Sequence, residues 1–433
     1  MRSSPFLLSL FFLAFISSTN AIDVKFSKPY NPLILPVKKD DATLQYYSTF
    51  NVGSFSYKAN AVIDLGGPFL WLNCNGSYMS SSYHAVECNT NECSAAGGSI
   101  FCFGCDGAFR PGCTNNNTCG VFPYNPYNNS VVTGGLGKDN IVFGPRSWKV
   151  SNFPLACGIP EQLYGLSKSA QGMVGLGKTP VSLPTQIFSA FNLPRKFALC
   201  VPSSGRHERF GGIVFGGGPY YMIPYPKDVS KLLVSTPLIV NPVSTAPVRN
   251  EGDASYEYFI GVKSIKIDGK SVPFNSSLLY IDKKGVGGTK ISTVTPYTVL
   301  HTNIYKALVK EFVKSAASKK VVSVTPVKPF GACFDSKTIH SYKTGSNVPV
   351  IDLVLQSESV YWRIHDTNSM VRVNKDVVCL GFVDGGSKPT TSIVVGGHQL
   401  EDNLLEFDIA ASELRFSSSL LLYNTKCSHF KDV

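Results

Sequence analysis

Short runs of alternating apolar and polar residues dominate the chain. In YFIGVKSIKIDGKSV, RFGGIVFGG and VCLGFVDGG, Val, Ile, Phe and Tyr alternate with other residues, and Gly or Asp-Gly interrupts the runs. Turn residues at intervals of about 8–12 positions are typical of antiparallel strands joined by tight turns. The pattern therefore predicts a protein built mainly from β-strands.

Helical periodicity is confined to two segments. In TNIYKALVKEFVKSAASKK, apolar side chains recur at helical spacing at Ile304, Leu308, Phe312 and Ala316. Thr302 or Asn303 is the predicted N-cap of this helix. A shorter helix, SLPTQIFSAF, is predicted from Ser182. The segment NPVSTAPVRNEGDAS (241–255) lacks periodicity and is interpreted as a linker between two halves.

The two halves contain a weak repeat. In the first half, AVIDLGG around Asp64 is followed 111 residues later by Gly175 in GMVGLG. In the second half, TKISTVT around Ser292 is followed 104 residues later by Gly396 in IVVGG. Each pair has apolar residues leading into a turn and then a distant apolar-apolar-Gly. The repeat indicates two similarly built halves.

The N-terminal residues predict that the protein is secreted. Arg2 precedes an apolar run from Phe6 to Ile16, and small or polar residues follow up to Ala21. This arrangement matches a secretory signal peptide, expected at residues 1–21. No later stretch approaches the roughly 18 apolar residues of a membrane helix. Because 433 residues exceed what one core usually supports, we expect two lobes in the secreted chain, at residues 22–245 and 246–433.

The cysteines and the charge narrow the chemistry. Twelve Cys, an even number, favour disulfides in a secreted protein. Metal binding is the competitor at the C-x-x-C of Cys102 and Cys105, but no His lies nearby at ligand spacing, so no metal or cofactor is expected. The net charge of +11 is dispersed, which argues against nucleic acid. An acidic extracellular polymer or protein partner fits better, and solubility alone explains the charge equally well. Four sequons predict glycosylation: Asn75, Asn116, Asn128 and Asn275.

Three segments give the chain a specific resemblance. Asp64 with Gly66, followed by PFLWLNC, resembles the first catalytic segment of pepsin-like aspartic proteases. GMVGLGKTPVSLPTQI resembles the Gly-Leu-Gly segment of their plant branch, and VVGGHQLEDNLLEFDIAASELRF resembles the segment that closes the second lobe. The resemblance covers nearly the whole mature chain. It implies an all-β, bilobal pepsin-like fold with a pseudo-twofold, a cleft between the lobes and a few short helices.

The same resemblance argues against an enzyme. Peptide hydrolysis in these proteases needs two carboxylates that share one proton. Asp64 supplies the first, but Ser292 stands where the second is expected, and its hydroxyl cannot share that proton. Val294 and Leu65 also replace the usual Gly and hydroxyl residue of the two sites. Asp282, in YIDKKGVGG, is the alternative second acid, although it lies outside the matching strand. Asp64 alone is therefore interpreted as a structural remnant.

The flap is a further departure from the protease pattern. The Tyr-Gly-Asp-Gly-Ser flap motif of the plant branch is absent, and the region reads YNPYNNSVVTGG. Tyr124 and Tyr127 are loose candidates for the flap tyrosine.

The altered second site and several phrases resemble a group of plant proteins. VVCLGFVDGG, SIVVGGHQLEDNLLEFD and the segment 348–364 are similar to extracellular dermal glycoprotein, xyloglucanase inhibitors, xylanase inhibitors and basic seven-S globulins. The resemblance implies a monomer in the apoplast that inhibits microbial endoglucanases of the xyloglucanase or xylanase type. In that group, loops of the C-terminal lobe enter the groove of the glycosidase, where basic side chains meet its paired carboxylates.

Two segments match those loops, SKKVVSVTPVKPF (318–330) and DGGSKPTTS (384–392). The candidate inhibitory residues are Lys319, Lys320, Ser323, Lys328, Lys388, Pro389 and Thr390. Ser323 and Thr390 stand where the xyloglucanase inhibitors have arginines, and lysine neutralises a carboxylate only as a point charge. Lys319 and Lys320 are equally well explained by the dipole at the end of the predicted helix.

The resemblance also implies a disulfide framework. Cys333 is expected to pair with Cys379 in the C-terminal lobe, Cys200 with Cys427, and Cys74 with Cys157. The remaining six are expected to form local pairs: Cys88, Cys93, Cys102, Cys105, Cys113 and Cys119. Two other functions stay open, an aspartic endopeptidase and a wall-associated or storage globulin that binds a peptide or an acidic polysaccharide.

Overall fold

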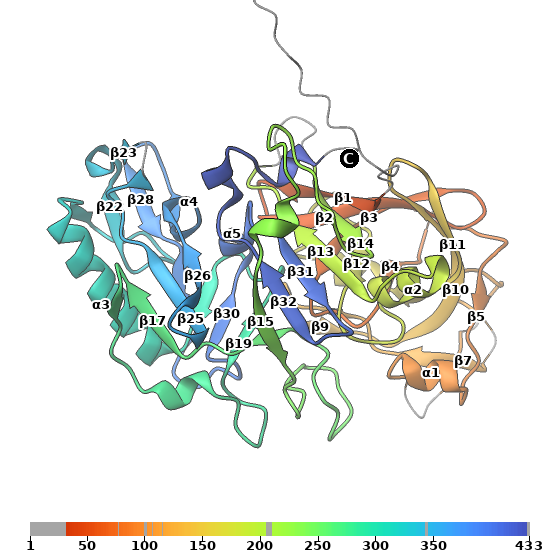
Figure 1. The fold of residues 1–433 in the computed structure, drawn as a ribbon. Helices are drawn as coiled ribbons and strands as arrows, with labels where there is room; N and C mark the ends of the chain where they lie inside the picture. Colours follow the sequence, from red (N-terminus) through yellow and green to blue (C-terminus); the bar gives the residue numbers. More distant parts are fainter. Residues whose placement is uncertain are drawn as a thin grey trace, which may run out of the picture. The chain divides into compact units, whose positions relative to one another are not determined.

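Strands form most of the ordered structure, as the alternating pattern predicts (Figure 1). The computed structural model describes residues 32–430, except 77, 99–101, 106, 115, 205–209 and 343–344. The expected signal peptide at 1–21 lies outside these residues. Residues from Pro32 onward form one compact unit. Among the described residues, no helix is both long enough and apolar enough to cross a bilayer.

The N-terminal half is built around a strongly paired sheet. Its strands are β1 (Leu33–Asp40), β2 (Gln45–Val52), β3 (Tyr57–Asp64), β4 (Leu70–Asn73), β10 (Gly134–Phe143), β11 (Trp148–Gly158) and β12 (Gly172–Gly175). A cysteine-rich excursion adds β5 (His84–Ala85), α1 (Asn91–Ala95), β6 (Cys102–Phe103) and β7 (Thr118–Val121). The hairpin of β8 (Tyr124–Asn125) and β9 (Ser130–Val131) follows it.

The C-terminal half repeats the arrangement with shorter strands. These strands are β16 (Phe259–Ile260), β17 (Ser264–Ile267), β18 (Lys270–Ser271), β19 (Thr289–Ile291), β20 (Thr298–Leu300), β21 (Ser323–Val324), β22 (Cys333–Asp335), β23 (Ser341–Tyr342), β24 (Gly345–Ser346), β25 (Ile351–Ser357), β26 (Val360–Ile364), β27 (Met370–Arg372), β28 (Val377–Leu380), β29 (Phe382–Asp384) and β30 (Ile393–Val395). Two short helices, α4 (Asp366–Ser369) and α5 (Gly397–Leu400), pack nearby.

Both predicted helices are present. α2 spans Leu183–Phe191, and it ends at Asn192, whose left-handed φ of 50° stops the helix. α3 spans Thr302–Ser318 and buries the four predicted apolar side chains. Its N-cap, however, is His301, whose ring accepts from the Asn303 N–H at 3.1 Å. The expected caps at Thr302 and Asn303 are therefore wrong by one or two positions.

The weak sequence repeat corresponds to matched strand pairs. β3 runs parallel to β12 with Asp64 opposite Gly175. β19 runs parallel to β30 with Ile291 opposite Val395, and the Ser292 N–H donates to the Val395 carbonyl at 2.9 Å. Antiparallel pairing of β4 with β12 and of β20 with β30 completes each copy. Asp64 and Ser292 therefore stand at equivalent strand ends, in a bilobal pepsin-like fold.

A central sheet joins the two halves (Figure 1). Its strand order is β1, β14 (Gly211–Phe215), β13 (Lys196–Cys200), β31 (Leu405–Asp408), β32 (Glu413–Phe416) and β15 (Val234–Ile239). Phe197 on β13 stacks on Phe407 of β31 with ring centroids 5.0 Å apart. Strands from both sides of the expected boundary at residue 245 thus belong to one sheet.

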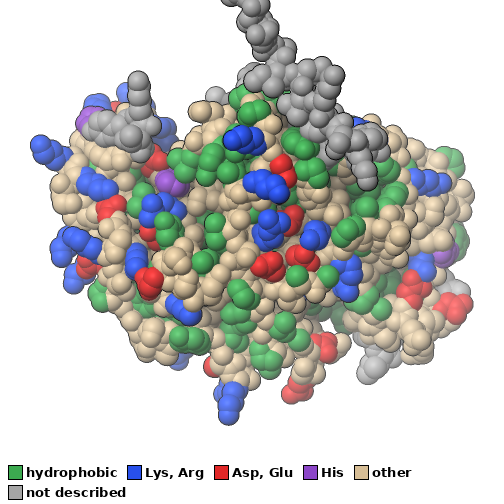
Figure 2. Space-filling model, in the orientation of Figure 1, with side chains coloured by type: hydrophobic (Ala, Val, Ile, Leu, Met, Phe, Trp, Pro, Cys, Tyr) green, Lys and Arg blue, Asp and Glu red, His purple; other side chains and the backbone are tan. Residues whose placement is uncertain are grey.

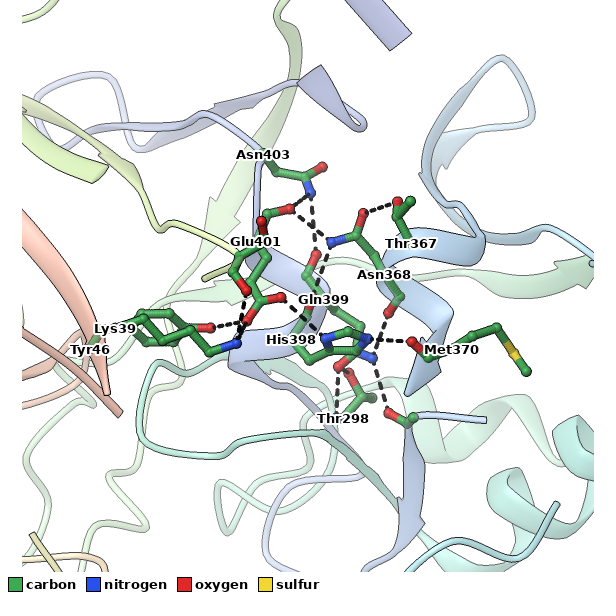
Figure 3. A network of polar contacts seen from close by, with 12 residues as sticks. Lys39, Tyr46, Thr298, Thr367, Asn368, Met370, His398, Gln399, Glu401 and Asn403 are labelled. Atoms are coloured by element: carbon green, nitrogen blue, oxygen red, sulfur yellow. Dashed lines mark hydrogen bonds and ion pairs between the residues drawn. The ribbon is translucent and has the colours of Figure 1, made fainter. Parts of the chain in front are cut away.

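A buried polar network adds a second connection between the halves (Figure 3). Glu401, directly after α5, accepts from Tyr46 at 2.8 Å and pairs with Lys39 at 2.6 Å. The His398 ring lies 3.3 Å from the other Glu401 oxygen and 3.1 Å from the Met370 carbonyl. Strands β1 and β2 are thereby attached to the C-terminal half through one carboxylate.

Candidate functional site

Asp64 and Ser292 line the same cavity, which has a volume of about 410 Å³. One residue ties the two strand ends together. The Thr293 hydroxyl donates to the Ile63 carbonyl at 2.7 Å and accepts from the Leu65 N–H at 2.9 Å. Leu65, which has no hydroxyl, cannot return the contact. Only Thr293 therefore links the two strand ends through its side chain. This link holds Ser292, the residue before Thr293, near Asp64.

Ser292 brings a hydroxyl to the position that Asp64 occupies in the first copy. Its oxygen lies 3.3 Å from the Thr295 hydroxyl and accepts from the Val294 N–H at 3.3 Å. Val294 takes the place that corresponds to Gly66 and packs against the hydrophobic cluster around Trp71. A serine hydroxyl does not ionise in the pH range of a carboxyl group, so this pair cannot share a proton as two carboxylates do.

An ion pair that the sequence analysis missed lies beside Asp64. Glu257 accepts from Lys290 at 2.7 Å, and both side chains are largely buried. Glu257 is so close to the Asp64 turn that a Cβ on Gly66 would lie 3.1 Å from its Cγ. Lys290 precedes Ser292 by two residues, and strand residues two apart share a face, so this spacing could have revealed it. Glu257 follows the supposed linker, and no sequence pattern marks it.

Burial and a neighbouring charge change the acidity of Asp64. Burial first, and then the negative charge of Glu257, raise its pKa to about 6. The N–H groups of Gly66 and Gly67 and the charge of Lys290 oppose this rise. The Gly66 N–H donates to Asp64 Oδ1 at 2.9 Å. Asp64 therefore changes its charge near pH 6 rather than near its ordinary value.

A hairpin lies at the cavity although the flap motif is absent. β8 and β9 pair between Tyr124 and Val131, and Tyr124 lines the cavity. Burial and the charges of Asp64 and Glu257 raise the pKa of Tyr124. The Tyr127 hydroxyl is buried and has no hydrogen-bond partner among the described residues. Tyr124 and Tyr127, the candidates for the flap tyrosine, thus belong to a hairpin whose sequence lacks the flap motif.

The segment expected to be a linker forms part of the cavity wall. Residues 245–248 line the cavity. Asn241 is fully buried, and its side chain donates to the Gly285 carbonyl at 2.8 Å. Ser244 and Ser255 are also buried. The segment connects β15 to β16 without regular secondary structure, as a linker does, but local polar contacts hold it in place at the cavity. Asp282, the alternative second acid, is exposed and caps a turn outside the cavity through the Lys284 and Val286 N–H groups.

The first candidate loop starts at the end of α3. Lys319 pairs with Asp268 at 2.8 Å, so its charge is already used within the molecule. Lys320 is exposed and has a left-handed φ of 63°. Ser323 lies exposed in β21 opposite Phe334, and Lys328 is exposed at the far end of the loop. The expectation that Lys319 faces a partner is thus not supported by its contacts.

The second candidate loop reaches the same region. Tyr305, in the first turn of α3, contacts Gly331 after the first loop, and Asp384 at the start of the second contributes to raising its pKa. Lys388 and Thr390 are exposed, and Pro389 is half-buried between them. Thr390 also lines the cavity of Asp64. Figure 2 shows Lys and Arg side chains spread over one face, with several at the end that carries α3.

Comparison with known proteins now identifies the family. Residues 46–217 match the family model described as Xylanase inhibitor N-terminal, and residues 257–418 match Xylanase inhibitor C-terminal. A relative named Probable aspartic proteinase GIP2, from Nicotiana benthamiana, is 47% identical over 96% of this chain and 95% of its own length. The chain belongs to the xylanase inhibitor family.

A globulin and two solved structures are also similar to this chain. Basic 7S globulin from Glycine max is 34% identical over 97% of this chain and 95% of its own length. A crystal structure of edgp superposes with a TM-score of 0.88 at 48% identity, covering 92% of this chain and 98% of that one. The crystal structure of soybean Basic 7S globulin gives a TM-score of 0.78 at 33% identity, covering 94% of this chain and 100% of that one.

The disulfides agree with the framework that the resemblance to this family implied. Cys74 pairs with Cys157, Cys200 with Cys427, and Cys333 with Cys379. The local pairs are Cys88–Cys102, Cys93–Cys119 and Cys105–Cys113. Cys102 and Cys105 are thus bonded to different partners, which removes the metal-binding alternative there. The four sequon asparagines are all exposed: Asn75, Asn116, Asn128 and Asn275.

Proposed function

We propose that this chain is a secreted, non-catalytic pepsin-fold protein that inhibits microbial cell-wall-degrading glycoside hydrolases of the xyloglucan-specific endo-β-1,4-glucanase type. It would act in the plant apoplast, as a monomer and in defence. The observation that carries the proposal is that two loops with exposed lysines both reach the first turn of α3, where Tyr305 contacts Gly331 and the Thr302 hydroxyl donates to Asp384 at 2.6 Å. Membership of the xylanase inhibitor family supports this class of function.

The chemistry of inhibition rests on charge. Glycosidases hold two carboxyl groups about 5–10 Å apart in an open groove. Lys328 and Lys388 are exposed cations on loops that project from a rigid scaffold, and Lys320 is a third. Lys319 is left out, because Asp268 already neutralises it. Lysine lacks the two-pronged geometry of arginine, so we expect moderate rather than very tight inhibition.

The cleft supports a non-catalytic role. Asp64 shares its cavity with Ser292 and with the Glu257–Lys290 ion pair, and a serine stands where the second acid of the proteases would be. Extracellular location is supported by six disulfides, which persist in oxidising compartments. The exposed sequons are compatible with glycosylation. No detectable cleavage of casein or haemoglobin is expected between about pH 3 and pH 6.

The test is an inhibition assay against a fungal xyloglucan-specific endoglucanase. Lys328→Ala and Lys388→Ala should each raise the inhibition constant by more than about tenfold, because each leaves a carboxylate of the enzyme unpaired. Lys319→Ala and Lys149→Ala, a change at an exposed lysine of the N-terminal half, serve as controls. Each should change the inhibition constant less than about twofold. Thr390→Arg should strengthen inhibition by supplying a bidentate partner.

Three results would contradict the proposal. One is wild-type protein that does not inhibit the endoglucanase, another is pepstatin-sensitive peptidase activity, and the third is loss of inhibition in Asp64→Ala but in neither loop variant. Several relatives are named as globulins or conglutins. Retention by an acidic wall polysaccharide without enzyme inhibition would favour a function of the globulin kind instead.

A further inference from the structure

The outer face of α3 has a row of three lysines. Lys306, Lys310 and Lys314 are all exposed and follow one another at intervals of four residues. Residues at this spacing lie on one side of a helix with a rise of about 6 Å from each to the next, so the row extends over about 12 Å. The four buried side chains of α3 lie on the opposite side of the helix. The lysine row therefore faces away from the core.

No acidic side chain neutralises the lysine row. Among the described residues, none of the three lysines forms an ion pair. Glu311, the only acid within α3, is half-buried and pairs with none of them. Asp268 contacts the C-terminal end of the helix, but it is already paired with Lys319 at 2.8 Å. Figure 2 shows several Lys and Arg side chains at the end of the molecule that carries α3 in Figure 1. The row is thus a surface of uncompensated positive charge.

The stability of the helix does not explain the lysine row. The helix dipole favours cations in the last turn, but the last turn of α3 contains no basic residue. Like charges four residues apart repel one another and destabilise a helix. Two such pairs occur here, Lys306 with Lys310 and Lys310 with Lys314. A ligand with regularly spaced negative charges would remove this repulsion.

The surface around the row restricts the class of ligand. No side chain of α3 is an exposed large apolar or aromatic group, and such groups usually anchor a protein partner. A linear polyanion needs no anchor of this kind, because the release of its counterions supplies the affinity. The six disulfides favour an extracellular setting. In that setting an acidic polysaccharide fits the row better than a nucleic acid does.

We propose that the lysine row binds a linear polyuronate, a polysaccharide whose sugar units carry carboxylates, along the outer face of α3. Carboxylates of the polymer pair with the three lysines, whose flexible stems adjust to the spacing of the charges. The polymer then holds the protein on an acidic polysaccharide matrix. Lys328 and Lys388 of the candidate loops take no part in this contact. The binding is therefore separate from the proposed inhibition, and either function can fail without the other.

The experiment measures binding of the full secreted chain to polygalacturonate by isothermal titration calorimetry. Fully methyl-esterified polygalacturonate is the matched probe, because it has the same sugar chain without the charges. At an ionic strength of about 0.1 M the charged polymer should bind at least about tenfold more tightly than the esterified one. Its affinity should fall as the salt concentration rises, with a linear relation between the two logarithms.

Two triple variants of the row test its charge. Lys306→Gln with Lys310→Gln and Lys314→Gln should weaken binding of polygalacturonate at least about tenfold. The slope of the salt dependence should become shallower by about two, at about 0.7 for each lost contact. Replacing the same three lysines with Arg keeps the charge and should keep the affinity within about threefold. The Gln variant should be at least as stable as wild type in urea, since the repulsion along the helix is gone.

A matched variant separates the row from the net charge of the protein. Lys58→Gln with Lys149→Gln and Lys168→Gln removes three exposed lysines of the N-terminal half. It loses the same charge as the Gln variant of the row, but it should change the affinity for polygalacturonate less than about twofold, because distant surface charges are screened. Inhibition of the endoglucanase should stay within about twofold of wild type in both Gln variants.

Four results would overturn the proposal. Equal losses in the two Gln variants would make the binding a property of net charge alone, and equal binding of the esterified polymer would exclude pairing with carboxylates. Binding of poly-L-glutamate but not of polygalacturonate would assign the row to an acidic protein partner. Loss of endoglucanase inhibition in the Gln variant of the row, with binding of polygalacturonate intact, would place the row in the inhibitory surface instead.

Discussion

Asp64 owes its chemistry to its surroundings rather than to its position in a motif. Burial and Glu257 raise its pKa, while two N–H groups and Lys290 lower it, and the rise prevails. A carboxyl group whose pKa is higher in the folded than in the unfolded chain binds its proton more tightly when folded. The free energy of unfolding therefore falls as the pH rises from about 4 to about 6.

Asp64→Asn should remove this penalty. The difference in unfolding free energy between variant and wild type should be small near pH 4 and should grow to about 1–3 kcal/mol in favour of the variant at pH 7.5. Urea denaturation of both proteins across this pH range measures it. A wild type that is at least as stable as the variant at pH 7.5 would show that Asp64 is not strained by its surroundings.

Thr293 makes the two contacts that hold the strand ends of the cleft together. Thr293→Val keeps the shape of the side chain but leaves the Leu65 N–H and the Ile63 carbonyl without their partner. The loss should cost about 1–3 kcal/mol. Thermal and urea denaturation would measure it against Thr325→Val, a change at an exposed threonine. Equal stability of the two variants would mean that water replaces the lost hydroxyl.

At the scale of elements, α3 organises the candidate loops. The first loop leaves the C-terminal end of α3 and returns to Tyr305 in its first turn, where the second loop begins. β22 and β28 support the first loop from beneath, and Cys333 lies opposite Cys379 in their register. The disulfide therefore fixes the base of the loop.

Removing this disulfide should affect both stability and inhibition. Cys333→Ala with Cys379→Ala opens a loop of 46 residues and should lower the unfolding free energy by about 4 kcal/mol. Cys105→Ala with Cys113→Ala opens a loop of only 8 residues in the N-terminal half and should cost less, about 2.5 kcal/mol. Only the first pair should also weaken endoglucanase inhibition. An unchanged inhibition constant would place the inhibitory surface elsewhere.

The sequence predicted elements better than it predicted the cleft. Alternation and periodicity report which faces are buried, so the strands, both helices and the repeat could be predicted. Lys290 could have been found from its strand spacing to Ser292. Glu257 and the wall at 245–248 could not, because single polar contacts such as that of Asn241 with Gly285 hold them. Such contacts depend on distant residues, and no local pattern encodes them.

At the scale of the whole molecule, the Glu401 network determines how firmly the two halves are attached (Figure 3). Burial alone would raise the pKa of Glu401, but His398 and Lys39 outweigh burial and hold the pKa below its ordinary value. A carboxyl group with a lowered pKa stabilises the fold above its unfolded pKa, and this contribution is lost as the pH falls through the folded value.

Glu401→Gln should therefore destabilise the protein by about 3–5 kcal/mol at neutral pH, because Lys39 is left buried without its partner. The difference from wild type should shrink below about pH 4, as Glu401 itself becomes protonated. Glu358→Gln, which removes an exposed partner of Lys266, should cost less than about 1 kcal/mol. Urea denaturation measures the unfolding free energy of both variants. Equal losses in Glu401→Gln and Glu358→Gln would show that the network does not stabilise the fold.

The order of the central sheet also has a consequence for biosynthesis. β31 and β32 lie between β13 and β15, yet they are synthesised long after both of these strands. Until β31 and β32 have been synthesised, β13 and β15 each have an unpaired edge that is open to wrong partners or chaperones. The Cys200–Cys427 bond cannot form until residue 427 has been synthesised. A nascent chain that stalls before residue 405 therefore cannot leave behind a finished N-terminal half.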